Sequence, residues 1–129
     1  MPRLIPASRI RDAASTRYFP AMTLDEYQSA AARTTNPRLS DTERLFDAAA
    51  GLAEESGEIL GLVRKHAYQA HPLERDKLQT ELGDALWCLT MTAQGAGLSL
   101  EQVATTNIAK LRARYPAGYS DADSQGRSR

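Results

Sequence analysis

Two long helical patterns joined by one short turn dominate this sequence. The first places large apolar residues at heptad-like spacing, at Leu45, Leu52, Ile59 and Leu62. The second has a comparable apolar face, made of Leu78, Leu82, Ala85, Leu89 and Ala93. Spacing of this kind is typical of amphipathic α-helices. Because only a turn at His71-Pro72 separates the two stretches, we expect the two helices to pack side by side in opposite directions.

Local signals at the helix ends predict two further helices. Thr23 followed by Glu26, and Ser99 followed by Gln102, have the spacing of a capping box, which satisfies free backbone groups at a helix start. The expected helices cover 24–34, 41 to between 66 and 70, 73–96 and 100 to about 115. No stretch of useful length shows the alternation of a strand. The sequence therefore predicts an all-α fold, an antiparallel helical bundle of four main helices.

The chain is long enough for one domain, and we expect this domain to span 23–119. A helical chain of this size often completes its core by homo-oligomerisation, so we expect a second copy to pack against it. Residues 1–22 are interpreted as a flexible or partner-wrapping arm, not a targeting peptide, because Pro2, Pro6 and Pro20 break any long helix there. The polar segment 120–129 is expected to be a disordered tail.

Charge and cysteine content exclude several classes of function. Sixteen basic and sixteen acidic residues give a formal net charge of zero, which argues against a nucleic-acid polymer as partner. No apolar run approaches the roughly 20 residues needed to cross a bilayer, so no membrane partner is expected. Cys88 is the only cysteine. Since it cannot form an intramolecular disulfide, a reducing, cytoplasmic location is predicted.

Two pairs of acidic residues stand out on the two long helices. Glu55 and Glu58 lie three residues apart on the first, and Glu81 and Asp84 have the same spacing on the second. Each pair projects from one helix face, and antiparallel packing places both pairs at the edge of the seam. Crowded carboxylates repel one another unless a cation lies between them. From the residues alone, a divalent metal site and an ordinary solvated acidic surface both remain open.

The chemistry of these acids favours particular metals. Carboxylate oxygens without histidine or cysteine ligands suit Mg²⁺, with Mn²⁺ as a substitute, better than Zn²⁺. A di-iron carboxylate bundle would need Glu-x-x-His pairs, and the chain contains none. Neither Cys88 nor Ser56 has a suitably placed base in the sequence, so nucleophilic catalysis has no support.

The acidic pattern resembles a known family signature. Glu54-Glu55-Ser56-Gly57-Glu58 followed by Glu81-Leu82-Gly83-Asp84 is similar to the motif of MazG-like, all-α nucleoside triphosphate pyrophosphohydrolases. Downstream, Asn107-Ile108-Ala109-Lys110-Leu111 and then Arg114-Tyr115-Pro116 resemble the family's Asn-x-x-Lys-Leu and Arg-Tyr-Pro segments. The likeness covers about residues 23–120.

This resemblance implies a reaction and a set of roles. Water would split a nucleoside triphosphate into the monophosphate and pyrophosphate, in the housecleaning of nucleotide pools. It implies that the metal ions, Mg²⁺ or Mn²⁺, are held by Glu55, Glu58, Glu81 and Asp84. Glu54, with Glu55, would orient or activate the attacking water. Asn107 and Lys110 would contact the phosphates or the sugar, and the chain would form a homodimer or a homotetramer.

Several other residues have two interpretations each. Trp87 lies one turn beyond Asp84 and can stack on a base or belong to the core. Tyr27 and Gln28 can read a base edge or lie on a helix surface. The remaining candidates for substrate contact are Lys65 beside Arg64, which can equally be a solvated helix end, and Arg114 with Tyr115, which can equally cap a helix.

Two questions stay open from the sequence. The helix expected from residue 41 carries Gly51, Gly57 and Gly61, each costing about 1 kcal/mol relative to alanine. They indicate either close approach of another backbone or ligand, or tolerated weak positions. The alternative to an enzyme is a non-catalytic helical module that binds a nucleotide or a partner.

Overall fold

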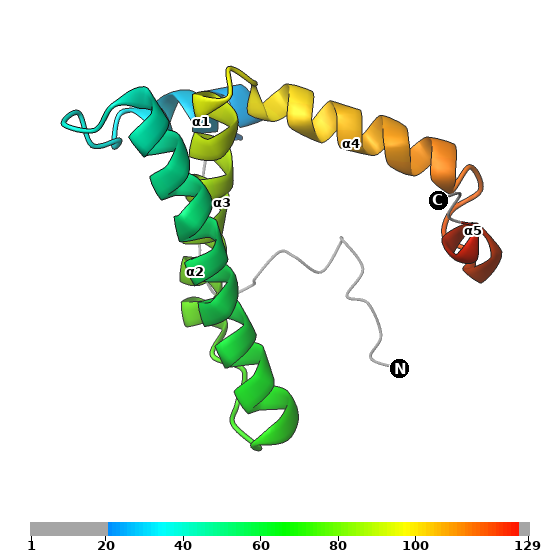
Figure 1. The fold of residues 1–129 in the computed structure, drawn as a ribbon. Coiled ribbons are helices and arrows are strands. Elements are labelled where there is room, and N and C mark those ends of the chain that lie inside the picture. The colour runs from blue at the N-terminus through cyan, green and yellow to red at the C-terminus, as the bar shows by residue number, and fades with distance from the viewer. Residues whose placement is uncertain (1–20, 127–129) are drawn as a thin grey trace.

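The computed structural model describes residues 21–126, and within that range five α-helices are joined by short connections. The helices are α1 (Leu24–Ala32), α2 (Asp41–Tyr68), α3 (Arg75–Gly95), α4 (Leu100–Arg114) and α5 (Asp121–Gln125) (Figure 1). The described part contains no strand, only an isolated bridge between Pro116 and Gly118. The prediction of an all-α fold is therefore confirmed. The predicted arm of residues 1–22 lies almost wholly outside the described residues.

Reciprocal capping boxes fix the start of three helices. At α1, the Thr23 hydroxyl accepts from the Glu26 backbone N–H at 3.1 Å, and the Glu26 carboxylate accepts from the Thr23 N–H at 2.7 Å. Ser99 and Gln102 form the same reciprocal pair at α4, so both predicted capping boxes are confirmed. Ser40 and Glu43 form a third, at α2. Such caps contribute about 1 kcal/mol each.

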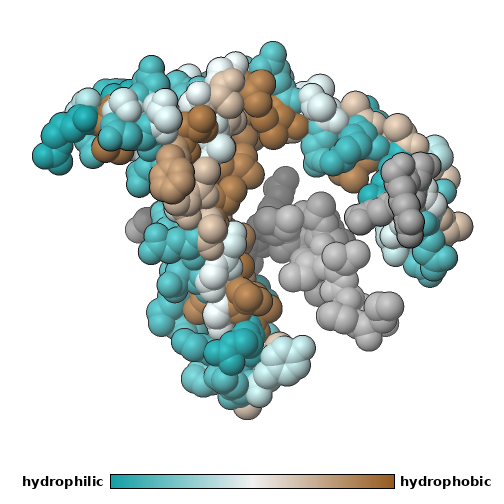
Figure 2. Space-filling model, viewed as in Figure 1, coloured by the Kyte–Doolittle hydropathy of each residue, from teal (hydrophilic) through white to brown (hydrophobic). Residues whose placement is uncertain are grey.

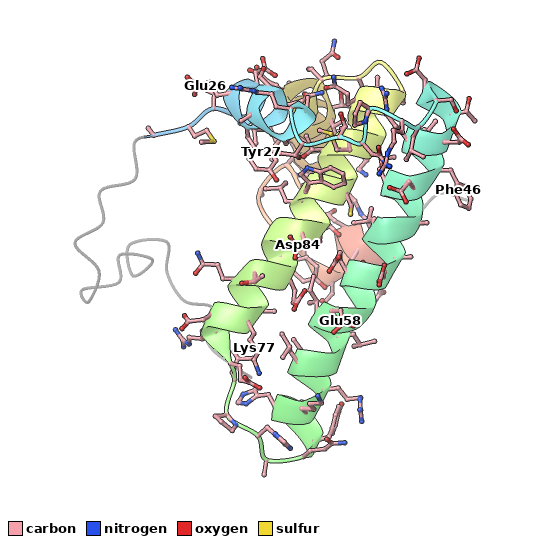
Figure 3. The ribbon with its side chains drawn as sticks, turned by 90° about the vertical axis from the view of Figure 1, so that its left-hand side faces the viewer. Glu26, Tyr27, Phe46, Glu58, Lys77 and Asp84 are labelled. Atoms are coloured by element: carbon pink, nitrogen blue, oxygen red, sulfur yellow. The ribbon has the colours of Figure 1, made fainter. Side chains whose placement is uncertain are left out.

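The α2–α3 hairpin is the most extensive helix pair of the fold, and its helices lie side by side along their length (Figures 1 and 3). Ala48 from α2 and Met91 from α3 are buried with Ala31 from α1 in a small core. Partly buried Tyr27 and Trp87 pack against it. Small residues in this core bring the helices close together, which sets the spacing of the side chains along the seam.

The glycines of α2 divide into two kinds. A Cβ at Gly51 would lie 2.8 Å from the Cys88 Sγ, whereas Gly57 and Gly61 have nothing within 4 Å of that position. Close approach therefore explains Gly51 alone. On α3, Gly95 plays the same part, because a Cβ there would lie 3.1 Å from the Leu45 Cδ1. These two contacts seat the helices against each other.

Helix α1 crosses the hairpin near its open end and is tied to the start of α4 (Figure 1). The Gln28 amide nitrogen donates to Gln94 Oε1 at 2.9 Å and to the Leu98 carbonyl at 3.1 Å. Its oxygen accepts from the Leu100 N–H at 2.6 Å. One side chain thereby joins the ends of α1, α3 and α4.

Helix α4 leads away from the hairpin at a large angle and does not fold back along it (Figure 1). The turn before it contains Gly97 with φ of 71°, a conformation that favours glycine. One chain therefore does not close the four-helix bundle that the sequence predicted. The three hydrogen bonds of Gln28, which we call the Gln28 clamp, and the Gly97 turn fix the direction of α4. In this direction α4 leads away from the hairpin instead of packing along it.

The C-terminal end also differs from expectation. Residues 120–129 were predicted to be disordered, but α5 occupies Asp121–Gln125 and is capped by the Ser120 hydroxyl. Arg114 holds it, donating to the Ser124 carbonyl at 3.1 Å. A polar sequence did not indicate this short helix, because it is stabilised by its cap and by the Arg114 contact and not by apolar burial.

Large apolar side chains remain exposed on the single chain, over the hairpin and at its junction with α4 (Figure 2). On α2, Phe46 is 75% exposed and Leu60 64%, and on α3 Leu82 is 52% exposed. Phe46 points outward from the hairpin (Figure 3). Exposure on this scale is unusual for a helix pair that works alone. None of the described helices has the length and apolarity that crossing a membrane requires.

Candidate functional site

Three carboxylates from two helices meet at the middle of the hairpin. Glu55 of α2 and Glu81 and Asp84 of α3 each offer an oxygen, and these oxygens all lie within 4.8 Å of one another. Glu55 and Glu81 are half-buried, and Asp84 is exposed. The antiparallel seam thus brings Glu55 next to two acids that follow it by 26 and 29 residues in the sequence. We call Glu55, Glu81 and Asp84 the acidic cluster.

The other two acids of the motif lie beside this cluster. Glu58 is exposed on α2, outside the group of three. Figure 3 shows it further from α1 along the hairpin than Asp84. Glu54 is exposed next to Glu55. Glu58 follows Glu55 by three residues and lies on the same helix face, whereas Glu54 directly precedes Glu55 and points to a neighbouring face.

Crowding in the cluster affects the protonation of Glu55. The pKa of Glu55 is raised, first by partial burial and then by the negative charges of Asp84 and Glu81. Burial, followed by the negative charges of Glu55 and Asp84, raises the pKa of the Cys88 thiol, which keeps it protonated and unreactive. Unlike a solvated acidic face, this arrangement carries an electrostatic cost that a cation would relieve.

The donor set fits a hard divalent cation. Its oxygens are close enough to share one ion, and they include no sulfur or imidazole ligand. Mg²⁺ is commonly held by one or two carboxylates together with substrate phosphates and water, so three protein carboxylates are sufficient. The half-exposed position also leaves room for a phosphorylated ligand.

Aromatic residues border the cluster on the side of α1. Tyr27 lies close enough to Asp84 that this carboxylate, after burial, raises the pKa of the phenol, and Figure 3 shows both residues on the same side of the hairpin. Trp87 follows Asp84 by one turn. Its indole N–H donates to the Thr34 hydroxyl at 2.8 Å, and its ring packs on the core. The interpretation of Trp87 as part of the core is therefore supported, and its stacking on a base stays a prediction.

Two other predicted contacts lie further away. The Gln28 amide is engaged by Gln94, Leu98 and Leu100, which favours a tertiary role over reading a base. Lys65 is exposed near the far end of α2 and lies close enough to Glu74 to help lower its pKa. Neither observation connects these residues to the acidic cluster.

The predicted substrate residues of α4 are separated from the cluster within one chain. Asn107 and Lys110 are exposed along α4, which leads away from the hairpin (Figure 1). At its end, the Arg114 guanidinium stacks over the Tyr115 ring at 5.0 Å. Tyr115 in turn lies 5.6 Å from the Tyr119 ring. This aromatic group holds the chain end and α5 together.

Sequence reasoning missed residues between the cluster and the start of α2. Arg44 and Asp47 line a cavity that Trp87 also borders. Asp47 precedes Glu54 by seven residues, so the heptad spacing places both on one face of α2. That spacing is the sequence feature that connects Asp47 to the acidic motif. By itself it does not single out Asp47, because no motif surrounds this acid.

Comparison with known proteins identifies the same family that the acidic motif resembles. A family model described as the MazG nucleotide pyrophosphohydrolase domain matches residues 47–119. The chain is also similar to the Gene 37 protein of Mycobacterium phage L5, with 34% identity over 105 residues, which is 75% of this chain and 92% of the phage protein. A search of solved structures gave no match.

Proposed function

This chain belongs to the family of MazG nucleotide pyrophosphohydrolase domains, and from that premise we propose that it hydrolyses nucleoside triphosphates to monophosphates and pyrophosphate, with Mg²⁺ as cofactor. Membership in the family implies a hydrolase that acts on nucleotides. The observation that carries the finer proposal is the acidic cluster, in which oxygens of Glu55, Glu81 and Asp84 lie within 4.8 Å of one another. The role we propose is housecleaning of the nucleotide pool.

The residues of the hairpin would divide the work as follows. Glu55, Glu81 and Asp84 would hold Mg²⁺, with Glu58 joining from the adjacent turn. When bound, the metal neutralises the triphosphate and polarises its phosphoryl oxygens. The Glu54 carboxylate would accept a hydrogen bond from the attacking water and orient it, and its exposed position beside Glu55 leaves it free to do so.

The positive charge that the reaction needs would come from α4. Lys110 and Asn107 would donate hydrogen bonds to phosphate or sugar oxygens, which stabilises developing negative charge. Because α4 leads away from the cluster of its own chain, we propose that these residues serve the cluster of a second copy. Substrate recognition would then require a homodimer or a homotetramer.

Exposed apolar residues support such an oligomer. Leu60 and Val63 on α2 and Leu82 and Leu86 on α3 are all more than a third exposed. Ile108 of α4, which is 46% exposed, has the same need for a partner. Burying side chains of this size stabilises by about 1.5–3 kcal/mol each. A second copy that covers the hairpin would thus complete both the core and the site.

A substrate panel tests the proposed reaction. The protein is incubated with ribo- and deoxyribonucleoside triphosphates and Mg²⁺, and the products are separated by chromatography. We expect monophosphate with pyrophosphate, and no turnover when EDTA removes the metal. Diphosphate with orthophosphate, or no turnover across the panel, would contradict the proposal.

One observation favours the alternative of a non-catalytic nucleotide-binding module. Within a single chain, α4, which carries Lys110 and Asn107, leads away from the hairpin that holds the acidic cluster (Figure 1). If the protein is a monomer in solution, its site lacks the expected positive charge. Calorimetry that detects nucleotide binding without any product would then favour the binding module over the enzyme.

A further inference from the structure

A cavity of about 360 Å³ lies between the α1–α2 connection, the start of α2 and the last turns of α3. Its apolar wall is formed by Leu39, Trp87 and Met91, and its polar wall includes Asn36, Arg44 and Asp47. A pocket of this volume is at the size at which small molecules bind. A lining that combines apolar and polar groups suits a planar, polar ring.

The cavity lies on the same face of the hairpin as the acidic cluster. On α3, Asp84, Trp87 and Met91 follow one another at spacings of three and four, so one helix face carries all three. Trp87 is about 4.5 Å of helix rise from Asp84, and Asp47 is about 12 Å of rise from Glu55. A ligand whose phosphates lie at the cluster would therefore extend toward the cavity.

Trp87 offers a fixed stacking surface there. Its indole N–H is held by the Thr34 hydroxyl at 2.8 Å, and its ring is supported by the core that contains Met91. A ring held in place loses little entropy when a base stacks on it, and stacking contributes about 1–3 kcal/mol per base.

The charges of the cavity wall leave one group without a partner. The Arg44 guanidinium donates to the Asn36 carbonyl at 3.0 Å and the Pro37 carbonyl at 3.3 Å, and it pairs with Asp41 at 3.5 Å. Arg44 therefore braces the connection between α1 and α2. Among residues 21–126, Asp47 forms no ion pair and no side-chain hydrogen bond. Its carboxylate is the free acceptor of this wall.

We propose that this cavity holds the nucleobase of the substrate, with Trp87 as the stacking surface and Asp47 as the acceptor that selects bases bearing an exocyclic amino group. The assignment rests on the proposed function, because it takes the acidic cluster as the phosphate end. Cytosine and adenine carry an amino donor at a ring position where uracil and hypoxanthine carry a carbonyl acceptor. A carboxylate attracts the first and repels the second.

Nucleosides without phosphate test the base site independently of metal and turnover. Trp87 is the only tryptophan, so its fluorescence reports stacking in the cavity directly. In EDTA, the protein is titrated with cytidine and with uridine, which differ in the group at ring position 4 and in the hydrogen on the adjacent N3, and then with adenosine and inosine. We expect saturable quenching and about tenfold tighter binding of cytidine than of uridine, the lower range for a hydrogen bond to a charged group.

Two variants sharpen the result. Asp47→Asn should reduce the cytidine-to-uridine ratio to near one while quenching persists, since an amide can present either a donor or an acceptor. Asp76→Asn, an exposed acid at the other end of α3, should leave the ratio unchanged. Circular dichroism checks that both variants keep their helical content.

The outcomes separate this assignment from the enzymatic proposal. Absence of quenching at millimolar nucleoside, equal binding of cytidine and uridine, or a ratio that Asp47→Asn leaves intact would overturn the base site. Hydrolysis of triphosphates could still be found in each of those cases. Conversely, selective cytidine binding in a protein that never turns over triphosphates would keep the base site and reject the enzyme.

Discussion

The α2–α3 hairpin and α4 carry the two halves of the proposed site, and they are held very differently. In the hairpin, Gly51 against Cys88 brings the helices together, and Glu55 and Glu81 are already side by side. On α4, Lys110 is exposed, and the helix leads away from the hairpin (Figure 1). The hairpin is thus a preformed half of the proposed site, whereas α4 would contribute to that site only by contacting a second copy.

This contrast predicts that removing an acid of the cluster has the largest effect on activity. Asp84→Asn keeps the shape of the side chain but takes away charge that the metal needs, so we expect a loss of about 100-fold or more in kcat/KM, comparable to removing a key transition-state contact. Glu81→Gln should behave alike. Steady-state kinetics measures the loss, with unchanged circular dichroism as control. Full activity in either variant would remove the cluster from the mechanism.

Mixing two inactive variants tests whether α4 serves a second copy. Lys110→Ala and Asp84→Asn should each be nearly inactive alone. After unfolding and refolding together in equal amounts, about a quarter of the wild-type activity should return, because half of randomly mixed dimers are heterodimers with one complete site of two. Recovery measured against separately refolded controls decides the matter. If nothing returns, α4 acts on its own chain or not at all.

Added metal should stabilise the hairpin. Mg²⁺ that binds only the native state at 100 times its Kd contributes about 2.7 kcal/mol, which raises Tm by several degrees for a chain of this size. Thermal melts with and without millimolar Mg²⁺ measure the shift. Glu81→Gln should abolish it, and a wild-type curve unaffected by metal would count against the site.

The seam itself can be probed through two glycines of α2. A Cβ at Gly51 would lie 2.8 Å from the Cys88 Sγ, so Gly51→Ala should destabilise by about 1–3 kcal/mol through overpacking. Gly61→Ala is the matched control, because open space surrounds it and alanine there should stabilise by about 0.5–1 kcal/mol. Chemical denaturation measures both. Equal effects at the two positions would contradict the close contact.

The smallest expected effect concerns the junction of α1 and α4. The pKa of Glu101 is raised by a hydrogen bond with Asp25 and by its negative charge. A carboxyl whose folded pKa exceeds its unfolded value adds stability below the unfolded pKa, and this is lost as the pH rises through the folded pKa. Glu101→Gln should therefore raise Tm slightly at pH 7 and less at pH 4. Melts at the two pH values check the sign.

The sequence predicted best what local physics determines. The capping boxes at Thr23 and Ser99 formed as expected, because each depends on residues three positions apart. The pairing of Glu55 with Glu81 followed from helical period and a short turn alone. Both features need only local geometry and one antiparallel contact.

What the sequence left undetermined depends on tertiary contacts. The direction of α4 is set by the Gln28 clamp and the Gly97 turn, and no periodicity encodes either. Glu58 matches the motif but lies outside the cluster, because helix packing decides which of two neighbouring acids faces the seam. Asp47 belongs to no motif, and the cavity that it lines exists only in the folded chain.

Anomalous diffraction from crystals grown with Mn²⁺ and a non-hydrolysable triphosphate analogue tests the central claim most directly. The account predicts a peak between the carboxylates of Glu55, Glu81 and Asp84, with the phosphates beside it. Peaks confined to other positions, or these three side chains turned apart into solvent with no metal between them, would contradict it.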